Sequence, residues 1–146
     1  MTANQNPIFT LVPDIQWGSV DDNSGATAGP ILTASTTMDG TGFTTTVFTA
    51  GANGSYVQRL IARPVGTNVA SVLRVFLNNG SSAATQSNNC LIAEAALPST
   101  SLSQTGMMSP VELPLNFALP AGYKIMVAIG TTVAAGYRVS VIGGDY

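Results

Sequence analysis

The chain has 146 residues, which is enough for one domain with its own hydrophobic core. Its seven acidic and five scattered basic side chains give a net charge of −2, which argues against a nucleic-acid-binding surface. Charged residues make up only 8% of the chain and apolar residues 45%, whereas ordinary soluble domains are about 25% charged. We therefore expect other copies or a partner to cover much of the surface; the alternative is that Ser, Thr and Asn alone keep it soluble.

Residues 1–29 are predicted to form an extended N-terminal arm, followed by a β-sandwich domain over residues 30–146. Pro7, Pro13 and Pro30 disfavour helix and promote extended backbone. The start of the chain has no Lys or Arg and no apolar run long enough for a signal peptide or a membrane span, so we expect synthesis in the cytoplasm and no membrane contact. An extended arm needs backbone partners on the domain or on a neighbouring chain. The candidate interface residues are Ile8, Phe9, Leu11, Ile15 and Trp17.

The rest of the chain predicts an all-β fold. Short runs of β-branched and aromatic residues alternate with Ser, Thr, Gly and Asn, and no stretch keeps a helical period beyond two turns. The Ala-rich run 90–97 could be helical, but eight residues ended by Pro98 are few for a helix. Eight such strands predict an antiparallel β-sandwich, most commonly an eight-stranded jelly roll, and a partly closed barrel would give a similar pattern. The predicted strands are 31–37, 43–49, 56–65, 71–78, 90–97, 111–117, 123–130 and 137–143.

One ten-residue sequence occurs twice. GTNVASVLRV at 66–75 and GTTVAAGYRV at 130–139 match at Gly, Thr, Val, Ala, Arg and Val. In each copy a β-rich run precedes Gly-Thr and another follows Val-Ala, so each copy predicts a hairpin, and two similar hairpins predict two facing sheets. Gly66 and Gly130 are candidates for a positive φ. Further turns are predicted at Asp39-Gly40, Asn53-Gly54 and Asn79-Gly80.

The loop that follows Asn79 sets an expected register between the strands beside it. If this loop closes symmetrically, Asn78 faces Cys90 and Arg74 faces Glu94, which gives a cross-strand ion pair. Cys90 is the only cysteine, so it forms no internal disulfide, and we expect a small buried apolar residue there.

Catalytic chemistry has few candidates. The chain has no His and one Cys, which excludes a Ser-His-Asp triad, a Cys-His pair and a zinc site of the usual ligands. Glu94 and Glu112 could form a glycosidase pair, but each lies in an alternating strand and Glu94 has Arg74 as a structural partner. Asp21-Asp22 could attract calcium, but the spacing of an EF-hand is absent and a solvated acidic turn is the simpler interpretation. We expect no catalytic residue, no cofactor and no metal.

Three stretches, residues 66–80, 91–103 and 113–146, resemble small virion structural proteins encoded near the capsid gene of tailed bacteriophages. The resemblance covers residues 56–146, rests on turn and strand motifs, and leaves the arm out. It implies a capsid decoration, or cement, protein: a β-rich, typically homotrimeric module on the outer capsid that binds the major capsid protein and bridges capsid subunits. The alternative is a receptor- or glycan-binding module of a phage tail fibre or spike. That alternative would place Trp17, Tyr56, Tyr123 or Tyr137 on an exposed platform.

Overall fold

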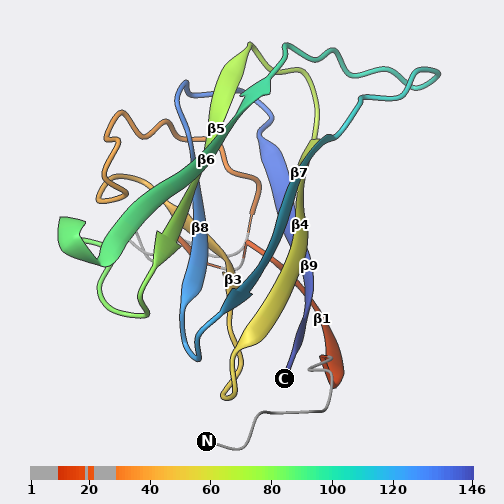
Figure 1. Ribbon diagram of the computed structural model, residues 1–146. Coiled ribbons are helices and arrows are strands. Elements are labelled where there is room, and N and C mark those ends of the chain that lie inside the picture. The colour runs from red at the N-terminus through yellow and green to blue at the C-terminus, as the bar shows by residue number, and fades with distance from the viewer. Residues whose placement is uncertain (1–9, 19, 22–28) are drawn as a thin grey trace, which may run out of the picture.

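Two antiparallel sheets pack face to face in the computed structural model, which describes residues 10–18, 20–21 and 29–146 (Figure 1). One sheet has the strand order β1-β9-β4-β7 and the other has the order β2-β3-β8-β5-β6. The predicted all-β sandwich is confirmed. Within the described residues the elements are β1 (Val12–Trp17), β2 (Val20–Asp21), β3 (Thr45–Thr49), β4 (Ser55–Pro64), β5 (Ser71–Asn78), the 3-10 helix η1 (Gln86–Asn88), β6 (Asn89–Leu97), β7 (Val111–Leu119), β8 (Lys124–Ile129) and β9 (Tyr137–Asp145).

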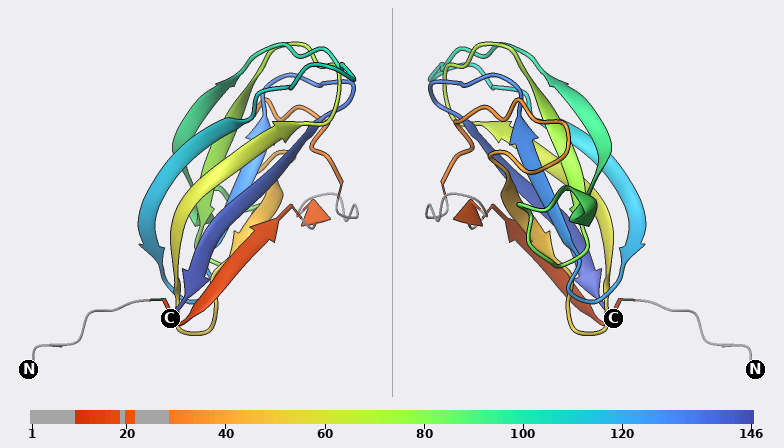
Figure 2. Two further views of the ribbon diagram at one scale, coloured as in Figure 1. Left: turned by 90° about the vertical axis from the view of Figure 1, so that its right-hand side faces the viewer. Right: turned by 90° about the vertical axis from the view of Figure 1, so that its left-hand side faces the viewer.

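The strand order is that of an eight-stranded jelly roll with the two-residue strand β2 added. Strands of the first half of the chain pair with strands of the second half in reverse order. The antiparallel pairs are β1–β9, β3–β8, β4–β7 and β5–β6. Apart from β2 and the β5–β6 hairpin, each connection crosses from one sheet to the other. One long hairpin is thus folded over into two layers, which Figure 2 shows from the side.

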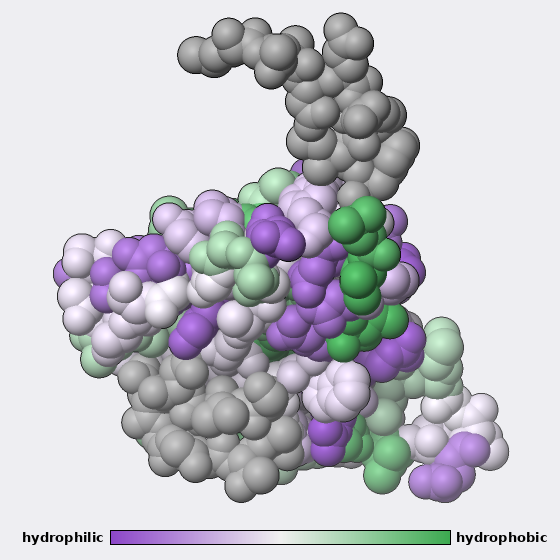
Figure 3. Space-filling view, turned by 90° about the horizontal axis from the view of Figure 1, so that it is seen from below, coloured by the Kyte–Doolittle hydropathy of each residue, from purple (hydrophilic) through white to green (hydrophobic). Residues whose placement is uncertain are grey.

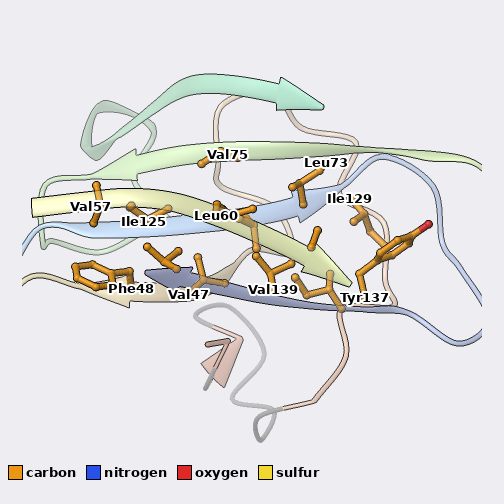
Figure 4. Close-up of a cluster of buried hydrophobic side chains, with 14 of the residues drawn as sticks. Val47, Phe48, Val57, Leu60, Leu73, Val75, Ile125, Ile129, Tyr137 and Val139 are labelled. Atoms are coloured by element: carbon orange, nitrogen blue, oxygen red, sulfur yellow. The ribbon is translucent and has the colours of Figure 1, made fainter. Parts of the chain in front are cut away.

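The core lies between the two sheets. Alternate residues of the strands point inward, and Figure 4 shows Phe48, Leu60 and Val139 among the side chains that meet there. Strand β8 is buried on both faces, because Met126 and Ala128 lie in a second cluster with Phe76 on the outer side of their sheet. A strand that is covered on both faces has a nearly continuous apolar sequence, as β8 has in KIMVAI.

The prediction of a strand over residues 31–37 is wrong. This segment makes only isolated bridges, at Ile31 with Tyr137 and at Ala34 with Ile129. Strand β3 pairs with β8 only as far as Val127, which leaves the edge of β8 open at Ile129, and Ser35 N donates to the carbonyl of Ile129 at 2.8 Å. The segment therefore closes an open strand end and does not run along a sheet.

The predicted register between β5 and β6 holds for only half of the hairpin. Arg74 faces Glu94, and Arg74 Nε lies 3.1 Å from Glu94 Oε1, as expected. A bulge between Val75 and Phe76 then shifts the register by one residue, so Asn78 faces Asn89 and not Cys90. The prediction that Cys90 is buried is also wrong. Cys90 is exposed, because β6 is the last strand of its sheet.

The two repeated sequences are connections between sheets, so the predicted hairpins are wrong. The first copy leads from β4 to β5 and the second from β8 to β9, and each pair of strands is divided between the two sheets. Neither Gly66 nor Gly130 has a positive φ. Both positions are instead crowded: an added Cβ would lie 2.7 Å from Ala135 Cβ at Gly66 and 2.6 Å from Val72 Cγ1 at Gly130. The glycines of the repeat serve close packing.

Candidate interaction surfaces

Strand β1 is an edge strand whose backbone is paired with the domain. It runs antiparallel to β9, from Val12 opposite Asp145 to Trp17 opposite Ser140. The N–H of Leu11 extends this pairing by donating to the carbonyl of Asp145 at 2.7 Å. For this part of the predicted arm, the backbone partner is the chain's own sheet. The boundary predicted at residue 29 stays a prediction.

The side chains of β1 have an inverted arrangement. Asp14 and Gln16 are half-buried, and the Gln16 amide bonds the backbone of Thr49 twice, accepting from its N–H at 2.9 Å and donating to its carbonyl at 3.0 Å. Ile15 and Trp17 alternate with these polar residues and are 57% and 59% exposed. The polar side of the strand therefore faces the domain and the apolar side faces solvent.

The described candidate interface residues gather on this edge. Leu11 is 81% exposed and lies directly before β1, so it adds to the surface of Ile15 and Trp17. Figure 3 shows apolar surface on the right of the view, the side on which Figure 1 places β1. Ile8 and Phe9 lie outside the described residues. A row of exposed apolar side chains beside an aromatic residue is typical of a protein–protein contact.

A second surface is a groove of about 400 Å³ between β6 and β7. These strands end the strand orders of the two sheets, so the sandwich is open between them. The pattern of both strands alternates between exposed and half-buried residues, with no fully buried one before Leu97 and Leu119. The groove was not predicted, because the sequence does not show which strands are edges. Its lining residues are Leu77, Ile92, Ala93, Pro114, Leu115 and Phe117.

A third surface is one end of the sandwich, where the connections 65–70, 98–110 and 130–136 contain no charged residue. The first two are joined by a pair of backbone hydrogen bonds between Asn68 and Thr100, at 3.0 and 2.9 Å. Met107 in the longest connection is 85% exposed. These connections are uncharged and partly apolar, which suits contact with protein more than with water.

The two glutamates considered for catalysis are held apart in structural ion pairs. Glu94 pairs with Arg74, and Glu112 Oε2 lies 3.5 Å from Arg59 Nη1. The two glutamates belong to different sheets. In the described part of the chain, no three Cys, Asp or Glu side chains come close enough to hold a metal ion.

Other acidic groups have local partners. The side chain of Asp39 accepts hydrogen bonds from the hydroxyl and the N–H of Thr41, which lower the pKa of Asp39. The hydroxyl of Ser55 donates to the carboxylate of Asp145. Asp22, the second residue of the candidate calcium pair, lies outside the described residues. These contacts belong to a turn and to strand ends.

The aromatic residues do not form one platform. Tyr137 is only 1% exposed, and its hydroxyl donates to the carbonyl of Pro98 at 3.1 Å. Tyr123 is half-buried against the core. Tyr56 is half-buried and its hydroxyl lies 3.3 Å from Asn116 Oδ1. Among these candidates, Trp17 alone is largely exposed.

Known proteins offer few comparisons. No family model matches the chain, and no curated protein matches it. Two similar solved structures are those of the infectious bursal disease virus Gt strain and Gx strain. The first is 13% identical with a TM-score of 0.30 over 97% of this chain, and the second 10% identical with a TM-score of 0.30 over 99%. The chain spans about a third of their length, 35% and 36%.

None of the helical segments in the described residues is long and apolar enough to span a membrane.

Proposed function

We propose that this chain is a non-enzymatic structural protein of a tailed-bacteriophage virion, which decorates the outer capsid and stabilises it by bridging capsid subunits. The observation that carries the proposal is the inverted strand β1. Its polar residues Asp14 and Gln16 face the domain while Ile15 and Trp17 face solvent. An antiparallel edge strand of a soluble monomer has the opposite alternation, with the apolar side on the core. This edge is therefore suited to contact with another protein.

A bridging protein must contact at least two bodies, and the positions of the apolar surfaces suit that task. Strand β1 and strand β7 are the two ends of one sheet, so the β1 edge and the β6–β7 groove lie on opposite sides of the sandwich. The two sheets of the jelly roll would hold these two surfaces at a fixed separation. The low charge of the chain and the resemblance of residues 56–146 to phage virion proteins support the same role.

The proposed partners are the major capsid protein and further copies of this chain, most simply as a homotrimer. Contact between two different surfaces of identical chains is a head-to-tail contact, which forms a closed ring when the rotation between copies fits. The β1 edge and the β6–β7 groove are two such different surfaces. A ring of three copies would leave the uncharged connections 65–70, 98–110 and 130–136 at the end of each sandwich available for the capsid.

The test compares a double variant, Ile15→Ser with Trp17→Ser, against a control variant, Met38→Ser, whose side chain is also about half exposed but lies away from β1. Sedimentation and binding to particles that lack this protein are measured for both. We expect the double variant to lose assembly or particle binding while its melting temperature stays near that of the unmodified chain, and the control to behave as the unmodified chain. Equal binding by both variants would contradict a role for this edge.

A further inference from the structure

Arg63 on β4 and Arg138 on β9 lie directly opposite each other on the outer face of their sheet. The register between the two strands pairs these residues, and both are exposed. Side chains directly opposite on neighbouring antiparallel strands have Cβ atoms about 4.5–5.5 Å apart, and like charges at this spacing destabilise the sheet. A chain with only five basic residues thus places two of them where they repel each other.

Other arginines of the sandwich are neutralised. Arg59, on the same strand and face as Arg63, lies 3.5 Å from Glu112, and Arg74 lies 3.1 Å from Glu94. Within the described residues, neither Arg63 nor Arg138 makes an ion pair or a side-chain hydrogen bond. Three further carboxylates have polar partners: Asp14 accepts from Gln16, Asp39 from Thr41 and Asp145 from Ser55.

The surroundings of the pair are those of a protein contact. Trp17 faces Ser140, two residues along β9 from Arg138, so the indole is a diagonal neighbour of Arg138 on the same exposed face. Ile61 lies two residues before Arg63 on the same face and is buried. Arginine and tryptophan are the residues most enriched at the energetic centres of protein interfaces.

We propose that Arg63 and Arg138 form a binding site for the carboxylates of an acidic segment on a partner protein. A planar guanidinium group makes two parallel hydrogen bonds to one carboxylate, so two adjacent guanidinium groups can hold two neighbouring acidic side chains. Such a partner removes the repulsion within the pair. Nucleic acid is the less suitable ligand, because its affinity comes from many clustered cations and this chain has a net charge of −2. The site goes beyond the proposed function, since it names the chemistry of a contact that capsid decoration leaves open.

The first measurement is thermal unfolding of three variants of the full chain. Arg63→Gln and Arg138→Gln remove the repulsion, so each should raise the melting temperature, by about 1–3 °C. The matched control Arg59→Gln breaks an ion pair on the same face and should leave it unchanged or lower it. If Arg63→Gln and Arg138→Gln both lower the melting temperature, the pair is neutralised within the chain and the proposal is overturned.

The second measurement is binding of a capped hexaglutamate peptide at low salt, with capped hexaglutamine and a thymidine hexanucleotide as comparison ligands. We expect the chain to prefer hexaglutamate and each of Arg63→Gln and Arg138→Gln to weaken that binding about tenfold, with Arg59→Gln within twofold of the unmodified chain. Absence of hexaglutamate binding at millimolar peptide, equal binding by all variants, or tighter binding of the nucleotide would overturn it. The isolated chain is used throughout, so a negative result here leaves capsid decoration standing.

Discussion

The side chain of Asn68 and the backbone of Gly136 join the two copies of the repeated sequence. Asn68 Oδ1 accepts from the N–H of Gly136 at 2.8 Å, and Asn68 Nδ2 donates to the carbonyl of Gly136 at 3.1 Å. Asn68 is buried and also bonds Gly66 O and the N–H of Ala135. The repeat is therefore explained by assembly of the fold: two similar crossings between the sheets lie side by side at one end and satisfy each other's backbone.

Asn68→Ala should destabilise the domain by about 2–4 kcal/mol, because it removes the acceptor of the Ala135 and Gly136 N–H groups at a buried site. The control is Thr132→Ala, at the matching position of the second copy. Thr132 is exposed, and its hydroxyl accepts one hydrogen bond, from the N–H of Ala34 at 3.1 Å. We expect a cost below about 1 kcal/mol there. Urea unfolding measures both, and equal losses would show that the Asn68 network is not central.

Gly130→Ala should destabilise the domain by about 1–3 kcal/mol through overpacking, since the new methyl group would meet Val72 Cγ1. Val72→Ala in the same chain should recover part of that loss. Gly66→Ala should be rescued in the same way by Ala135→Gly. A double-mutant cycle with no coupling in either pair would mean that backbone conformation, and not close packing, selects these glycines.

The stability of the domain should fall in alkali. Burial raises the pKa of Tyr137 above its usual value near 10, so the unfolded chain loses this proton before the folded chain does. The stabilisation is complete below about pH 10 and is lost as the pH rises through the folded pKa. Tyr137→Phe should flatten this dependence in melting curves between pH 9 and 11. A variant with the same alkaline slope as the unmodified chain would assign the effect to other groups.

Gln16→Ala should cost about 1 kcal/mol, because one amide makes both hydrogen bonds to the Thr49 backbone and joins the edges of the two sheets. Trp17→Ser, one position along the strand, should leave the free energy of unfolding nearly unchanged since its side chain faces solvent. The reverse order of effects would show that Trp17 packs on the domain and that β1 is not inverted in solution.

Much of the fold was predictable because strand signals are local. The run 90–97 is too short for a helix and ends at Pro98, which identified β6 correctly as a strand, and the pairing of Arg74 with Glu94 followed from loop symmetry. The one-residue bulge beyond Val75 has no such local signal, so the partner of Asn78 was missed. The prediction that the repeated Gly-Thr sequences form hairpins is wrong for a related reason. A hairpin and a connection between two sheets have the same flanking strands, and only tertiary packing distinguishes the two.

The candidate interaction surfaces were predictable only in part. The apolar residues of the predicted extended arm included Leu11, Ile15 and Trp17 as interface candidates, and the structure shows all three exposed. That Gln16 faces inward depends on the pairing of Trp17 with Ser140, a contact between residues far apart in the sequence. The same holds for Arg63 and Arg138, which only the pairing of β4 with β9 brings together.

The most direct test of the central claim is the copy number of this protein in purified virions. If the chain is a phage protein, as proposed, quantitative mass spectrometry of the particles gives its molar ratio to the major capsid protein. For a decoration protein we expect a ratio fixed by the capsid lattice, comparable to one copy per capsid subunit or a simple fraction of it, which falls when Ile15→Ser and Trp17→Ser are introduced together. Absence from the particles, or a few copies per virion as for a tail-tip protein, would contradict it.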